Sequence, residues 1–208
     1  MSESALPRSM QATTSPAAAR VAQGRLSRPA GWWGMLVFVT SEATLFGALI
    51  GSYFFLRFQN VHWPPPGTPA KAPAIPLIML AVLVSTSVPM QLASLAGRAG
   101  RALAAWLLVA LALLVQAGYF AFEIHDFQGD LQRFSPRDNA YGSSYYTLLG
   151  ADHLHVAVGL LFNLWLVLRL LGGLTNYRLT GLRAVTLYWH AVNVITVLVF
   201  LTILSPSI

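Results

Sequence analysis

Five long apolar runs constrain this chain more than any other feature of its sequence. They cover about residues 32–56, 74–96, 102–124, 146–169 and 184–204. A helix needs ~20 mostly apolar residues to cross a bilayer, and each run is long enough. Hydrophobic residues make up 56% of the chain and charged residues only 10%, whereas ~25% of residues are charged in an average soluble domain. The sequence therefore predicts an all-α, polytopic membrane protein, a bundle of five transmembrane helices.

The segments between these runs carry residues that typically end helices. They are the Pro-rich stretch at 63–67, the short turn at 97–101, the polar stretch at 125–144 and the Gly-containing stretch at 172–181. Residues 1–30 are rich in Ala, Ser, Pro and Arg and lack the apolar core of a cleaved signal peptide. We expect a flexible basic N-terminal tail at 1–30, followed by one transmembrane domain at 31–208.

The distribution of basic residues predicts the orientation in the membrane. The tail and the second and fourth connections hold nine of the thirteen Lys and Arg residues. Because basic residues concentrate on the cytoplasmic side, we expect the N-terminus in the cytoplasm and Ile208 outside. The net charge of +6 does not indicate nucleic-acid binding, because the basic residues lie at the ends of apolar runs and form no continuous basic face. The chain has no cysteine, which excludes disulfides, iron–sulfur clusters and thiolate zinc sites.

Glu42 lies well inside the first apolar run. An ionised carboxylate at the centre of a bilayer costs at least ~2.5–3.5 kcal/mol, so we expect this group to be neutral, paired or next to a hydrated pocket. Small residues follow it at Gly47, Ala48, Gly51 and Ser52. Small residues let helices approach closely, so they predict that this helix packs against others instead of facing lipid.

Other polar residues crowd the last three runs, and we expect an interhelical polar cluster formed by Gln116, Asp152, His153, His155, Tyr188, His190 and Asn193. His153 and His155 are two residues apart, so they point to different sides of a helix and cannot bind one metal from the same face. A haem held by His155 and His190 on two helices stays open as an alternative. Glu123 and His125 lie close to the predicted outer boundary, where we expect them to be solvated.

Several motifs, in this order, resemble subunit III of the haem-copper cytochrome oxidases. They are FVTSE at 38–42 followed by YFFLR at 53–57, WPPPG at 63–67, Gln116-Ala117, YGSSYY at 141–146, GADHLHV at 150–156, and YWH at 188–190. The resemblance covers residues 32–204. It is specific because the motifs keep the order and the spacing of that family.

The resemblance implies a non-redox accessory subunit of a proton-pumping oxidase of aerobic respiration, driven by cytochrome c or quinol. Such a chain carries no haem, copper or other metal of its own, contacts subunits I and II, holds phospholipids and sustains proton uptake. Glu42 matches the family's carbodiimide-reactive carboxyl, and Arg169 matches an arginine that contacts lipid phosphate. The implied location is the inner (plasma) membrane of a bacterium.

The chain departs from the family pattern in three respects. Relatives usually have seven helices, so two N-terminal helices are absent here, and a partner such as subunit I is expected to supply them. The family places a histidine at Asp152 and acids at Tyr119 and Asn193, so a fixed proton path through this chain does not follow from the resemblance. An accessory protein of nitric oxide reductase, a membrane haem b cytochrome and a proton-coupled transporter remain alternative functions.

Overall fold

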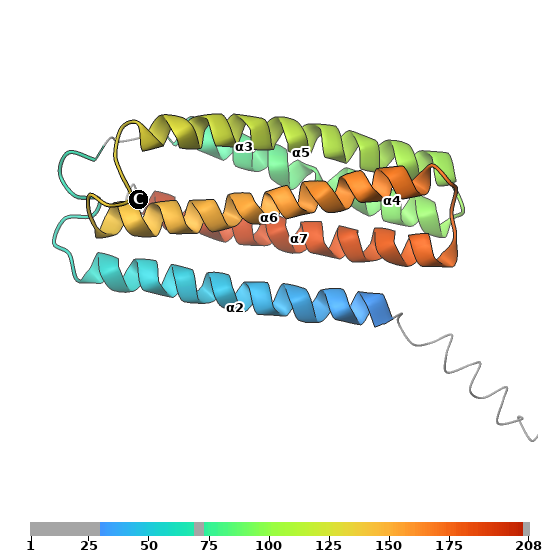
Figure 1. Ribbon diagram of the computed structural model, residues 1–208, viewed down its shortest axis with the longest axis horizontal. Helices are drawn as coiled ribbons and strands as arrows, with labels where there is room; N and C mark the ends of the chain where they lie inside the picture. Colours follow the sequence, from blue (N-terminus) through green and yellow to red (C-terminus); the bar gives the residue numbers. More distant parts are fainter. Residues whose placement is uncertain (1–29, 69–72, 206–208) are drawn as a thin grey trace, which may run out of the picture.

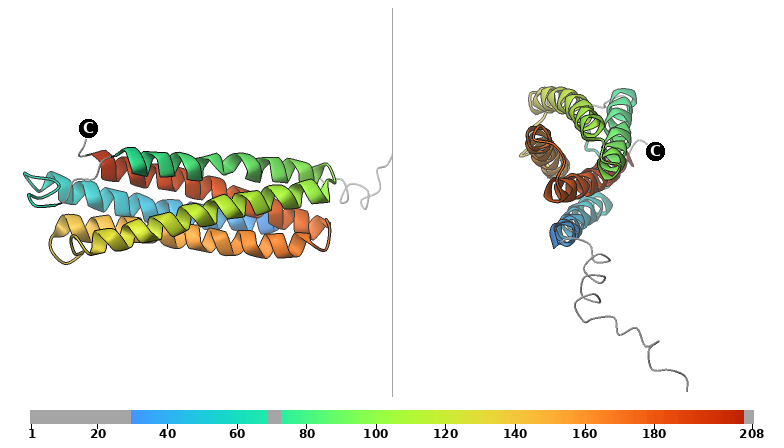
Figure 2. Two further views of the ribbon diagram at one scale, coloured as in Figure 1. Left: turned by 90° about the horizontal axis from the view of Figure 1, so that it is seen from above. Right: turned by 90° about the vertical axis from the view of Figure 1, so that its right-hand side faces the viewer.

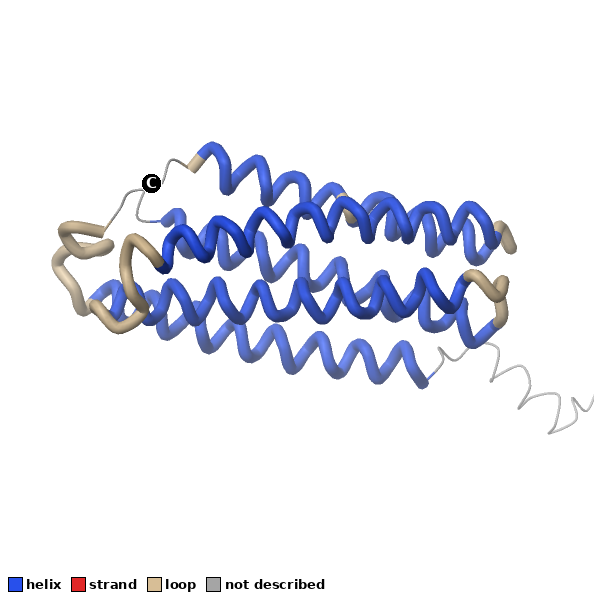
Figure 3. The backbone as a smooth tube through the Cα atoms, turned by 45° about the horizontal axis from the view of Figure 1, so that its top comes forward, coloured by secondary structure: helices blue, strands red, loops and turns tan. Residues whose placement is uncertain are grey.

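The computed structural model describes residues 30–68 and 73–205, which form six helices (Figure 1). They are α2 (Ala30–Phe58), α3 (Ala74–Ser85), α4 (Ser87–Arg98), α5 (Ala102–Leu131), α6 (Ala140–Leu170) and α7 (Asn176–Leu204). The described residues contain no strand (Figure 3). The predicted tail, apart from Ala30, lies outside the described residues.

The helices run side by side as one long bundle, and α3 with α4 forms a single span (Figure 1). Five spans are therefore long and apolar enough to cross a membrane: Ala30–Phe58, Ala74–Arg98, Ala102–Leu131, Ala140–Leu170 and Asn176–Leu204. The predicted fold class and the number of spans are confirmed.

The second span is broken at Thr86, between α3 and α4. Pro89 causes the break because it has no N–H to donate to the carbonyl one turn earlier. Around the break the Thr86 backbone N–H donates instead to the Leu83 carbonyl at 3.0 Å, a tighter turn than in an α-helix. This break is not among the features predicted from the sequence, although a proline inside an apolar run is a usual cause of one.

The last three helices extend beyond the apolar runs that predict them. The polar stretch at 125–144 is mostly helical, since α5 continues to Leu131 and α6 begins at Ala140. The Asn139 side chain caps α6 by accepting from the Gly142 N–H at 2.8 Å, and Thr175 caps α7 by accepting from the Arg178 N–H at 3.2 Å. Both predicted connections are therefore too long, because hydropathy detects the part of a helix that suits the bilayer and not the whole helix.

Helix α2 packs on one side of the bundle and contacts only α6 and α7 among the described helices (Figure 2). Its buried residues are Phe46 and Tyr53. The small residues Gly47, Ala48, Gly51 and Ser52 are all exposed on this chain. Within this chain the large residues of α2 make the contact with α6 and α7, so the prediction that the small residues pack against another helix is not met by the described helices.

Two apolar clusters hold the bundle together. One joins α3, α4, α5, α6 and α7 around the fully buried Trp189, and the other joins α2, α6 and α7 around Phe46 and Tyr53. Within the first cluster, α6 and α7 approach closely at Gly159 of α6, where a Cβ atom would lie 2.7 Å from Cζ2 of Trp189. Glycine at this position lets the indole of α7 lie directly against the α6 backbone.

Candidate functional site

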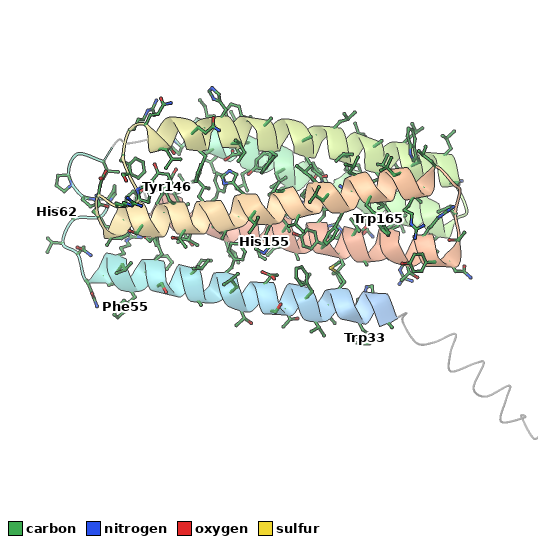
Figure 4. All side chains as sticks on the ribbon, in the orientation of Figure 1. Trp33, Phe55, His62, Tyr146, His155 and Trp165 are labelled. Atoms are coloured by element: carbon green, nitrogen blue, oxygen red, sulfur yellow. The ribbon has the colours of Figure 1, made fainter. Side chains whose placement is uncertain are left out.

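Glu42 of α2 meets His155 of α6 near the middle of the bundle, where Figure 4 labels the histidine. The carboxylate Oε2 and the imidazole Nε2 are 2.7 Å apart, and the side chains are 19% and 13% exposed, respectively. The pair joins the outlying helix α2 to the rest of the bundle. Glu42 is therefore paired, one of the three environments that its depth in the sequence predicts.

Besides Glu42, two neighbours contact the His155 ring, and a third holds the backbone of the same residue. Its Nδ1 lies 2.7 Å from the Ala151 carbonyl oxygen, one turn earlier on α6, and Phe46 of α2 meets the ring at 71° with 5.0 Å between centroids. The Tyr188 hydroxyl of α7 donates to the His155 carbonyl oxygen at 2.7 Å. The imidazole is thus oriented by contacts from α2 and α6, and α7 holds the backbone of His155.

These contacts determine the number of protons that the pair holds. A carbonyl oxygen only accepts hydrogen bonds, so the proton on Nδ1 is donated to Ala151. The 2.7 Å contact between Nε2 and Oε2 then needs one proton, which belongs either to a carboxylic acid or to an imidazolium. In both forms the pair has zero net charge, so it avoids the cost of an isolated charge in the membrane.

The other polar residues at this level of α6 face different helices. Asp152 Oδ1 accepts a hydrogen bond from the Thr196 hydroxyl of α7 at 2.8 Å. His153 faces α5, where its Nε2 lies 3.7 Å from Oε2 of Glu123. The two histidines therefore point to opposite neighbours, as their spacing in the sequence predicts.

Glu123 is buried, with 5% of its surface exposed, so the prediction that it is solvated is wrong, whereas His125 is exposed as expected. The signal that could have placed Glu123 is helical spacing. Gln116, Tyr119 and Glu123 follow one another at intervals of three and four residues and so share one face of α5. Since Gln116 is completely buried, Glu123 is carried into the interior by the same face.

The rest of the predicted polar cluster forms separate contacts. Gln116 donates to Thr86 Oγ1 at 3.1 Å and accepts from Asn163 Nδ2 at 2.6 Å, which links three spans beside the break in the second one. Asn193 donates to Ser87 Oγ at 2.7 Å. The seven residues thus tie neighbouring helices together at several points and do not converge on one site.

The arrangement does not favour the bis-histidine haem alternative. The His155 Nε2 contacts Glu42 of α2, whereas the His190 Nε2 lies 3.3 Å from the Gln91 side-chain oxygen of α4. The two imidazoles therefore contact different helices. Within residues 30–68 and 73–205, no group of three or more His, Cys, Asp or Glu side chains is placed to hold a metal ion.

Arg169 is exposed at the end of α6 that lies near Trp33 and Trp165 in Figure 4. Its guanidinium carbon lies 5.5 Å from the Trp165 ring and 5.6 Å from the Tyr177 ring. Two aromatic faces hold the cation at an end of the bundle, where an anionic group could approach it.

These features define a polytopic membrane helix bundle with a neutral acid–histidine pair between its outlying helix and its main body. Comparison with known proteins then gives the family. The model of the family described as cytochrome c oxidase subunit III matches residues 25–207, and the chain belongs to this family. Its members are subunits of a multisubunit oxidase, so this chain is a multi-pass membrane subunit of an enzyme complex.

Individual relatives agree with this assignment. A cytochrome c oxidase subunit 3 from Thermostichus vulcanus is 28% identical over 171 residues, which are 80% of this chain and 83% of the relative. The subunit 3 of Pisaster ochraceus is 30% identical over 178 residues, covering 82% of this chain and 68% of the relative. The subunit 3 of Rhizopus stolonifer is 29% identical over 179 residues, with 82% and 62% covered, respectively.

Proposed function

We propose that this chain is a non-redox accessory subunit of a proton-pumping haem-copper terminal oxidase. In this role it packs against subunit I, holds phospholipid and sustains proton uptake during oxygen reduction. The observation that carries the proposal is the Glu42–His155 pair, which holds a carboxyl partly exposed inside the membrane within a pair of zero net charge. The outward face of α2 beside this pair contacts no other described helix and is available to a partner subunit or lipid.

The contacts of the membrane histidines support the non-redox part of this proposal. Both ring nitrogens of His155 are in hydrogen bonds, Nε2 with Glu42 and Nδ1 with the Ala151 carbonyl oxygen. The Nδ1 of His153 is hydrogen-bonded to the Leu149 carbonyl oxygen at 2.6 Å. His190 bonds to Gln91. The electron-transfer centres would then belong to partner subunits, and this chain would act on the stability and proton supply of the complex.

Co-purification tests the assignment directly. The full chain, tagged at one end and extracted in a mild detergent, is expected to bring with it an oxidase subunit I and a subunit II, together with haem absorbance. Deletion of its gene should reduce oxygen consumption of the membranes. Recovery of the tagged chain without subunits I and II and without haem absorbance would contradict the proposal, and a selective loss of nitric oxide reduction on deletion would assign it to a nitric oxide reductase.

The Glu42→Gln substitution is expected to leave the complex assembled, because an amide keeps the shape of the carboxyl and can still donate to His155 Nε2. The initial rate of oxygen reduction should stay within about twofold of the wild type, because the substitution does not touch a redox centre. A twofold change in rate corresponds to ~0.4 kcal/mol in the activation barrier. Without the exchangeable proton, the enzyme should lose activity faster during turnover. Oxygen electrode traces of the reconstituted complex measure both quantities.

The matched control for this experiment is Ser41→Ala, which alters the neighbouring exposed residue of α2 without touching the pair. Its initial rate and its rate of inactivation should both equal those of the wild type. If Glu42→Gln abolished oxygen reduction at once while the complex stayed assembled, the accessory role would be wrong.

The surroundings of Arg169 support its proposed role in lipid binding. Basic side chains near the membrane surface attract anionic headgroups, and Trp165 and Tyr177 would keep the guanidinium in place for a lipid phosphate. Arg169→Ala should therefore lose tightly bound anionic phospholipid, as measured by native mass spectrometry of the purified complex. Arg133→Ala, at an exposed position toward the opposite end of the bundle, should retain it. Equal lipid retention in both variants would reject the role of Arg169.

A further inference from the structure

A second group of titratable side chains lies inside the bundle on the side of α6 away from α2. Asp152 is 1% exposed, Glu123 is 5% exposed and His153 is 6% exposed. They come from α5 and α6, and the Thr196 hydroxyl of α7 donates to Asp152. The Glu42–His155 pair does not include any of the three, and the accessory role proposed above does not use them.

Glu123 and His153 are close but not in full hydrogen-bond contact. Nδ1 of His153 donates to the Leu149 carbonyl oxygen at 2.6 Å, so Nε2 is the free position of the ring. This buried Nε2 has no hydrogen-bond partner and lies 3.7 Å from the Glu123 carboxylate. The Phe120 and Phe127 rings lie beside the imidazole, with centroids 6.4 and 5.3 Å away.

Asp152 adds a second carboxyl to this environment. It lies within electrostatic reach of Glu123, His153 and His155, and its only hydrogen-bond donor among the described side chains is Thr196. The other titratable groups that face it are Tyr119 of α5, Tyr188 of α7 and, beyond Tyr188, Glu42 of α2. In the described part of the chain, no Lys or Arg comes within 4.0 Å of Asp152 or Glu123.

Charge balance then fixes how many protons this group holds. With both carboxylates ionised and His153 neutral, the three residues carry a charge of minus two in a region from which water is largely excluded. Unpaired charges are strongly disfavoured in such a region. The group becomes neutral when two protons occupy the three available positions, namely the two carboxyls and His153 Nε2.

We propose that Glu123, Asp152 and His153 form a second, buried proton-binding site that holds two exchangeable protons over three positions. Because one position is always vacant, a proton can move between them without creating a net charge. At least one of the two carboxyls is protonated in every neutral arrangement. The site lies next to the Glu42–His155 pair through Asp152, which reaches His155 electrostatically.

Infrared spectroscopy of the full chain in lipid nanodiscs at neutral pH tests this proposal without any oxidase activity. Protonated carboxyls give a C=O band that is separate from the carboxylate bands and shifts in deuterated water. In the Glu42→Gln background, which removes the first pair, part of this band is expected to remain. Glu123→Gln and Asp152→Asn, each added to that background, should each reduce it, whereas Asp138→Asn, at an exposed carboxyl, should leave it unchanged.

Replacing the histidine is expected to affect the C=O band differently from replacing either acid. With His153→Gln, two carboxyls remain and are neutral only when both are protonated, so the band should not fall. This variant also keeps the test informative if an acid substitution prevents folding, which circular dichroism would show. The proposal would be overturned if the C=O band of Glu123→Gln and of Asp152→Asn equalled that of Asp138→Asn. It would also be overturned if the band were reduced in His153→Gln. Neither result would bear on co-purification with an oxidase.

Discussion

Replacing Gly159 with leucine is expected to separate α6 from α7 and to lower the free energy of unfolding by about 3 kcal/mol or more, above the usual range for overpacked cores. The reason is the fully buried indole of Trp189, which occupies the space that a side chain at 159 needs. A Cβ atom there would lie 2.7 Å from one ring carbon and 3.0 Å from two others. The indole is rigid and packed on all sides, so the helices have to move apart.

Denaturant titration of the full chain in detergent, followed by tryptophan fluorescence, measures this loss. The matched control is Gly150→Ala on the same helix, where an added Cβ meets no atom within 4 Å. This control should unfold within ~0.5 kcal/mol of the wild type. A Gly159→Leu variant that is as stable as the control would mean that α6 and α7 are not packed as described.

Breaking the pair by His155→Leu is expected to have the second largest effect, a loss of about 3 kcal/mol, because removing one partner leaves the other buried and unsatisfied. The Glu42 carboxyl would then face apolar surroundings and would have no hydrogen-bond partner on α6. Glu42→Leu should lower the free energy of unfolding by less, roughly 1–3 kcal/mol, because the group left without a partner is a neutral imidazole nitrogen and not an acid. Helix α2 should also become more accessible to protease in the first variant, since this pair joins it to α6.

The double variant Glu42→Leu/His155→Leu separates the pair interaction from general packing. Since both polar groups are gone, its loss of stability should be smaller than the sum of the two single losses by about 1 kcal/mol or more. His190→Leu is the matched control, because that half-buried histidine has only a 3.3 Å contact with Gln91. Its combination with Glu42→Leu should be additive. Additive losses for Glu42 and His155 would contradict the shared proton.

The sequence was sufficient to predict the class of fold and the five spans, because apolar length is a direct requirement of the bilayer. It was less informative about where the helices end. The residues that extend α5 to Leu131 and start α7 at Asn176 include many polar side chains, and their helical state depends on capping and packing. The break at Thr86 followed from Pro89, a local signal that the hydropathy of the run concealed.

The candidate site could be predicted only in part. The depth of Glu42 indicated a partnered or neutral carboxyl, but the choice of His155 as its partner depends on how α2 lies against α6. The outward orientation of Gly47 and Gly51 could not be deduced either, because small residues favour close packing without specifying the neighbour. Glu123 was misplaced because its position along the helix suggested solvent, although its helical face agreed with that of Gln116.

The position of α2 also affects the order in which the protein can fold during synthesis. This helix is the first of the described helices to be made, yet its only neighbours among them are α6 and α7, which are made last. At the usual rate of ~5–20 residues per second, α2 waits on the order of ten seconds for its partners. Until α6 is inserted, Glu42 is a lone carboxyl in the bilayer, and any truncation before α6 would leave it without its histidine.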